Sequence, residues 1–103
     1  MELHLGADDR LRLDDPDNFR AFKLVIEQPR EKFDHVKRAL AATILLADAD
    51  TAWVSETGLR DLSGHARDHA WHHKLGEMIE KAKPHGWIDE ASQAIKAHVE
   101  WKE

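Results

Sequence analysis

Four of the chain's eight histidines fall within nine residues, in the stretch GHARDHAWHHKLGE. They are His65, His69, His72 and His73, and their spacings of three and four residues place them along one flank of a helix. Imidazole is a ligand for zinc, nickel and copper, and side chains at these spacings can share one ion. The stretch therefore predicts a candidate site for a divalent transition metal, the only cofactor that the sequence indicates.

A second interpretation of the same stretch is a solvated polar face beside the core. The zinc-protease helix motif is absent, because HARDH has no glutamate after its first histidine. A catalytic metal also needs an open position in a walled cavity, and this flank is expected to face solvent. Asp68 and His72 lie four residues apart at the edge of an apolar stripe. They are expected to pair, either as a general base at a cleft or as a structural contact.

Other reaction chemistry has little support in the sequence. The chain has no cysteine, which excludes disulfides, thiolate zinc sites and cysteine nucleophiles and fits a reducing compartment. Two of its three serines, Ser55 and Ser63, are expected to cap helices, and no G-x-S-x-G, phosphate-loop or dinucleotide motif occurs. We therefore predict no catalytic residues and favour a non-catalytic protein.

The charge balance and the tryptophans indicate protein partners. A formal net charge of −5 disfavours nucleic-acid binding, which depends on neutralising phosphates. Four tryptophans are many for 103 residues. Trp87 and Trp101 are hydrophobic anchors if they are exposed and core residues if they cover the helices. With Arg67 and Lys74, expected on the outward face of a helix, they form the predicted surface for a partner protein or a second copy.

The sequence contains no segment suited to a membrane. Its longest apolar run, residues 39–47, is far short of the ~20 residues of a membrane span. Its first residues also lack the basic and then apolar pattern of a leader. We therefore expect a cytoplasmic protein.

Strands are predicted near the start of the chain. Residues 2–5 and 10–13 alternate polar and apolar around GADD, which predicts a short hairpin, with a frayed end as the alternative. Asp15 before Pro16 is typical of a helix start. Residues 19–27, however, alternate and are rich in strand formers, so a turn followed by a strand is preferred.

Three helices are predicted in the middle of the chain. Apolar residues recur at helical spacing over 30–47. After a short strand at 51–54, Ser55 begins a two-turn helix that ends at Leu62. A third helix is expected over 63–83. Its core stripe comprises Trp71, Leu75, Met78, Ile79 and Ala82.

The C-terminal stretch has two interpretations. Residues 94–101 alternate apolar and polar from Ile95 onward, which predicts a strand paired with 87–89 in a hairpin. The alanines also permit a helix, in which Ala91, Ile95 and Val99 share one face. We prefer the strand.

Together these elements predict one α+β domain over residues 1–103. An N-terminal strand region covers 1–28, and residues 29–103 form a three-helix core with a C-terminal β-hairpin. The order helix, strand, helix, helix, hairpin resembles a winged helix domain in element order alone. We expect a small non-catalytic protein-interaction or accessory module. The alternatives are a winged-helix-like DNA-binding regulator and a histidine-rich metal-binding protein or small metalloenzyme.

Overall fold

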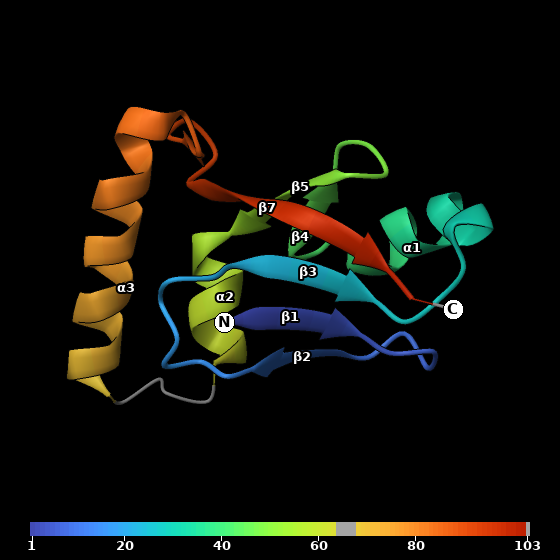
Figure 1. Cartoon of the computed structure of the whole chain (residues 1–103), viewed down its shortest axis with the longest axis horizontal. Helices are drawn as coiled ribbons and strands as arrows, with labels where there is room; N and C mark the ends of the chain where they lie inside the picture. Colours follow the sequence, from blue (N-terminus) through green and yellow to red (C-terminus); the bar gives the residue numbers. More distant parts are fainter. Residues whose placement is uncertain (64–67, 103) are drawn as a thin grey trace.

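Seven strands of the described chain form one mixed β-sheet (Figure 1). The structure is a computed structural model, and it describes residues 1–63 and 68–102. The strands are β1 (Glu2–Leu5), β2 (Leu11–Asp14), β3 (Lys23–Ile26), β4 (Ile44–Leu46), β5 (Thr51–Ser55), β6 (Ile88–Asp89) and β7 (Ala94–Trp101). Their order in space is β2-β1-β3-β7-β5-β4, with β6 paired to β7 beside this path. The sheet curls into a half-barrel whose concave face holds the core.

The described residues also form three α-helices and two 3-10 helices. These are η1 (Arg30–Lys32), α1 (Phe33–Leu40), α2 (Glu56–Leu62), α3 (His69–Ala82) and η2 (Lys83–His85). In Figure 1, α1 and α2 lie behind the sheet, whereas α3 runs crosswise beside the end at which β1, β3 and β7 begin. The outer face of the sheet carries none of the described helices. None of these helices is long and apolar enough to cross a membrane.

β7 is the strand around which the sheet is built. β5 pairs with residues 94–98 of β7 in antiparallel orientation. β6 pairs with 94–95, and β3 pairs in parallel with 98–101. Because β5 occupies one edge of β7 beside both stretches, β6 and β3 must share the other edge, one after the other. Beyond β6, the Lys96 amide still donates to the Trp87 carbonyl at 2.7 Å, so the pairing along this edge is interrupted at Ala97.

Alternation along β7 separates the core from the outer face. Ile95, Ala97 and Val99 are buried, while Lys96 and His98 are exposed. The rest of the core comes from both strands and helices, and its main members are Leu3, Leu5, Leu24, Ile26, Val36, Leu40, Ala52, Val54, Leu59, Trp71 and Leu75. The helices therefore cover the concave face, and the hydrophobic effect holds them there.

The predicted three-helix core with terminal hairpins is wrong, although the α+β class is correct. The strands near both ends of the chain belong to one mixed sheet, and the helices pack on that sheet. β7 makes the expected hairpin with β6 but continues as the partner of β3 and β5, so it is a central strand and not a wing. The likeness to a winged helix therefore does not hold, and it was the only argument for a DNA-binding regulator.

Two predicted helix boundaries are also wrong. The helix expected over 30–47 ends at Leu40, and the ILL that follows forms β4, because these strand-forming side chains find a partner in β5. α3 begins at His69, and Ser63, which was predicted to cap this helix, is not its N-cap. Asp68 is its N-cap, with the carboxylate accepting from the Trp71 amide at 3.1 Å.

Several local predictions are confirmed. The N-terminal hairpin exists as β1 and β2, β3 covers residues 23–26 of the strand expected over 19–27, and 51–54 lie within β5. Ser55 caps α2, because its hydroxyl oxygen accepts from the Gly58 amide at 3.1 Å. Alternation also correctly favoured a strand over a helix for β7. Local patterns thus predicted individual elements better than their arrangement.

The outer face of β2, β1 and β3 carries a network of ion pairs. Arg12 lies 3.0 Å from the Glu27 carboxylate, and His4 Nδ1 lies 3.2 Å from the same group. Lys23 extends the network to β7, at 3.2 Å from Glu100. The Arg12 guanidinium, and after it the His4 ring, hold the pKa of Glu27 below its ordinary value. The cations on this half of the outer face, Arg12 and Lys23, are therefore engaged within the fold.

We expect Glu27→Gln to be less stable than the wild type at pH 7 and less sensitive to acid. The pKa of Glu27 is lower in the folded state, so its ionised form stabilises the fold above the ordinary pKa, and this contribution is lost as the pH falls through the lowered value. The variant's Tm should lie a few degrees lower at pH 7, and the two proteins should converge as the pH falls through the lowered pKa of Glu27. Thermal melts followed by circular dichroism measure this. Glu31→Gln removes an exposed carboxylate from η1 and should behave as wild type. A difference for Glu27→Gln that stays constant with pH would contradict the role of the network.

Candidate functional site

The predicted histidine site lies partly outside the residues that the structure describes, since His65 and Arg67 fall there. His69 is exposed in the first turn of α3. His73 is also exposed, and its Nε2 lies 2.9 Å from the Glu77 carboxylate one turn further on. The described residues contain no group of three or more His, Cys, Asp or Glu side chains that could hold a metal ion. A metal site formed by the four histidines therefore stays a prediction.

His72 is held by Arg60 of α2. Arg60 Nη1 lies 2.8 Å from His72 Nδ1 and 3.3 Å from the His72 carbonyl oxygen, while Arg60 Nη2 donates to Glu56 at 2.9 Å. A guanidinium can only donate, so Nδ1 accepts and the proton of the neutral ring is on Nε2. Asp68, the partner expected from the sequence, accepts from the Trp71 amide at the start of α3. The contacts of His72 thus join α3 to α2.

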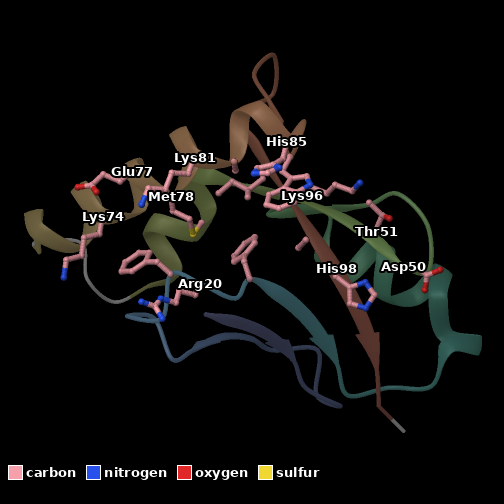
Figure 2. Close-up of a pocket in the computed structure, with 16 residues that line it drawn as sticks. Arg20, Asp50, Thr51, Lys74, Glu77, Met78, Lys81, His85, Lys96 and His98 are labelled. Atoms are coloured by element: carbon pink, nitrogen blue, oxygen red, sulfur yellow. The ribbon is translucent and has the colours of Figure 1, made fainter.

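A groove of about 860 Å³ opens between α3 and β7 (Figure 2). It lies where the pairing along one edge of β7 is interrupted at Ala97, and Phe22, the residue before β3, is part of its lining. α3 supplies the opposite wall with Lys74, Met78 and Lys81, which recur at helical spacing. The volume is within the ~300–1,000 Å³ of small-molecule sites. The interrupted edge of the sheet therefore creates the cavity.

The floor of the groove is apolar. Its lining includes Phe19, Phe22, Met78, Ala82, Trp87, Ile95 and Ala97. Trp87 is 47% exposed, and its ring stacks on His85 with the centroids 4.3 Å apart. Phe19 packs against the buried Trp71, with centroids 6.0 Å apart. The floor is therefore continuous with the core at one end and ends in an accessible aromatic pair at the other.

Cations surround the groove without counter-ions of their own. These groove cations are Arg20, Lys74, Lys81 and Lys96. Within the described part of the chain, none of the four makes an ion pair. Both carboxylates of the lining are engaged elsewhere, Glu77 with His73 at 2.9 Å and Asp50 with Arg30 at 3.7 Å. In a chain with a net charge of −5, this is a local excess of unpaired positive charge.

A row of side chains crosses the outer face of the sheet and ends at the groove. The register places Leu45 of β4 opposite Trp53 of β5, and Trp53 opposite Lys96 of β7. The Lys96 amide donates to the Trp87 carbonyl at 2.7 Å, which extends the β6–β7 pairing by one residue. Leu45 and Trp87, at the two ends, are 60% and 47% exposed, and they are the large hydrophobic residues exposed in the described chain. We call Trp87, Lys96, Trp53 and Leu45 the outer row.

The other residues predicted for partner binding have separate positions. Lys74 is a groove cation, whereas Trp101 lies at the far end of β7. Trp101 is half-buried, packs beside Phe33 with centroids 6.3 Å apart, and donates from Nε1 to the Ala49 carbonyl at 2.7 Å. It therefore ties the end of β7 to α1 and to the turn before β5.

Sequence reasoning missed the groove because its lining comes from distant parts of the chain. Phe22 was assigned to a strand and Met78 to the core stripe of a helix, and neither assignment predicts a shared cavity. One local indication was present, since Lys74, Met78 and Lys81 form a second stripe beside the core stripe of α3. This second stripe faces β7. The position of β7 depends on its pairing with distant strands, which a local sequence pattern cannot predict.

No protein-family model, curated protein or solved structure matches this chain. A proposal for the function of this chain therefore rests on the groove and the outer row. Both depend on Trp87, which belongs to each of them.

We expect Trp87→Ala and Trp101→Ala to differ in stability. Trp87 is half-exposed, so its removal should lower the free energy of unfolding by less than about 1 kcal/mol. Trp101 is packed and hydrogen-bonded, so its removal should cost about 2–4 kcal/mol. Urea denaturation followed by circular dichroism compares the two. Equal losses would mean that Trp87 is a core residue and is not available to a ligand or partner.

Proposed function

We propose that this chain is a non-catalytic protein-interaction module whose contact surface is the outer row. The observation that carries the proposal is the placement of Leu45 and Trp87, both exposed, at the two ends of one cross-strand row. Single exposed hydrophobic residues need no explanation, but a continuous row on an uncovered sheet face is typical of a contact surface. Tryptophan is also enriched at the energetic centres of interfaces.

A second copy of the chain is the partner that fits this row best. Two outer faces can meet about a two-fold axis that runs parallel to the strands, between β7 and β5. The row of one copy then runs opposite to the row of the other, so Lys96 lies over Trp53 and Trp87 lies against Leu45. The first contact is a cation–π pair and the second is apolar, and each occurs twice. Lys96 gives up no ion pair within the described chain when it makes this contact.

The contact should be weak, because only four side chains of each copy take part and the outer face of a half-barrel is convex. Interfaces of standard size bury about 1,600 Å², and smaller ones are typical of transient complexes. We expect a dissociation constant on the order of 0.1 mM. Such a contact suits a module that exchanges partners.

Sedimentation velocity from about 10 µM to about 1 mM tests this proposal. The weight-average sedimentation coefficient of the wild type should rise with concentration. Leu45→Lys places a charge at the end of the row and should abolish the rise. Ala39→Lys adds the same charge at an exposed position of α1 and should associate as the wild type does. A wild type that stays monomeric throughout this range, or a Leu45→Lys variant that associates normally, would rule out the outer row as the contact surface.

A further inference from the structure

We propose that the groove between α3 and β7 binds a small organic anion with an apolar body, such as a fatty-acid carboxylate or an aromatic sulfonate. This goes beyond a contact between copies of the chain. The groove shares Trp87 and Lys96 with the outer row, but its floor and its other cations come from α3 and from the loop before β3. Ligand binding and self-association can therefore be separated by substitution.

The shape of the groove suits a small molecule. It is a concavity of about 860 Å³ bounded by α3 on one side and β7 on the other (Figure 2). It lies beside the interruption of the sheet at Ala97, and its two long walls are α3 and β7, while Phe19, Arg20 and Phe22 come from the loop before β3. Walls on a helix and a strand are already formed before the ligand arrives, which reduces the ordering cost of binding.

The floor provides the apolar half of the recognition. Phe22 and Met78 are half-buried and pack against the core cluster, so they are positioned without a ligand. Trp87 stacks on His85 at the mouth and leaves about half of its surface accessible. An alkyl chain or an aromatic ring placed on this floor would remove apolar surface from water, at about 25 cal/mol per Å².

The groove cations provide the charged half. Arg20 comes from the loop before β3, Lys74 and Lys81 from α3, and Lys96 from β7, so three separate segments bring positive charge to one groove. None of these cations has an ion pair within the described chain. An anion would therefore gain charge-assisted hydrogen bonds without the loss of an existing pair. Glu77 and Asp50 also line the groove, so four cations and two carboxylates leave it a formal charge of +2.

A nucleic-acid strand fits this site less well than a small amphiphile does. Single-strand binding proteins follow several phosphates along a continuous positive path, with bases stacked on successive aromatic rings. Here the groove holds four cations on a chain with a net charge of −5, and other cations without ion pairs in the described residues, such as Lys37 and Arg38, lie away from it on α1. In Figure 2 the apolar floor lies between Lys74 and Arg20 on one side and Lys96 on the other, so a ligand with an apolar body on the floor can place one anionic head beside cations at the rim.

Fluorescence titration with 8-anilinonaphthalene-1-sulfonate tests the proposal, because this aromatic sulfonate emits strongly in apolar surroundings. We expect saturable binding at one site at low micromolar protein concentration, where the chain is monomeric. Dodecanoate, below its micelle concentration, should displace the probe. Dodecyltrimethylammonium has the same alkyl chain with a positive head and should not displace it. Added sodium chloride should weaken dodecanoate binding, since the charges lie at an open surface.

Charge-reversal variants locate the site. Lys74→Glu with Lys81→Glu should weaken the binding of both the probe and dodecanoate by about tenfold or more. The control is Lys37→Glu with Arg38→Glu, which makes the same change in net charge at exposed positions of α1 and should leave the affinity within about twofold of wild type. Circular dichroism establishes that both double variants are folded.

Two further variants keep the groove cations in place. Met78→Gln changes the floor alone and should weaken binding while leaving its dependence on salt intact. Leu45→Lys, which changes the outer row alone, should bind the probe as wild type does. Met78→Gln should therefore impair ligand binding without affecting self-association, and Leu45→Lys should impair self-association without affecting ligand binding.

Three results would overturn the proposal. The first is probe binding that the Lys74→Glu, Lys81→Glu variant leaves unchanged. The second is equal displacement of the probe by dodecanoate and by dodecyltrimethylammonium, which would mean adventitious binding to apolar surface. The third is displacement by a short oligothymidylate at lower concentration than dodecanoate, which would assign the groove cations to a nucleic-acid strand.

Discussion

The structure depends on the pairing of β7 along both of its edges. Buried backbone N–H and C=O groups need hydrogen-bond partners, and a central strand finds them on two sides. β5 supplies one side along most of β7, whereas β6 and β3 divide the other side between them. The parallel pairing with β3 carries the sheet on to β1 and β2, and the antiparallel pairing with β5 carries it to β4. Every other strand is therefore placed directly or indirectly by β7.

The division of one edge between two strands also explains where the surface features lie. The groove lies beside the interruption at Ala97, and α3 closes its far side (Figure 2). On the outer face, the β1–β3 half carries a network of ion pairs that includes Arg12, Glu27 and His4. The other half carries the outer row, in which Lys96 has no ion pair among the described residues. Unpaired charge and exposed apolar surface thus meet at Lys96 and Trp87, beside the interruption.

The sequence predicted elements whose cause is local. Alternation predicted β7, the hydroxyl of Ser55 predicted the cap of α2, and the apolar stripe predicted the buried face of α3. The prediction failed for elements whose structure depends on residues distant in the sequence. The ILL of β4 continues the helical periodicity of α1, yet it pairs with β5, and that pairing outweighs the local preference. The groove could not be predicted for the same reason, since Phe22 and Met78 meet only because β3 and α3 both lie beside β7.

If β7 is the centre of the fold, native-state amide hydrogen exchange will show it directly. The amides of Ile95 and Val99 lie where β7 has neighbours on both edges, so they should exchange through global unfolding and be the slowest in the chain. The amides of Leu75 and Ile79 in α3, which packs at the end of the sheet, should exchange faster, through local opening. The opposite order, with α3 slowest and β7 opening locally, would contradict a sheet-centred fold and would favour the helical core expected from the sequence.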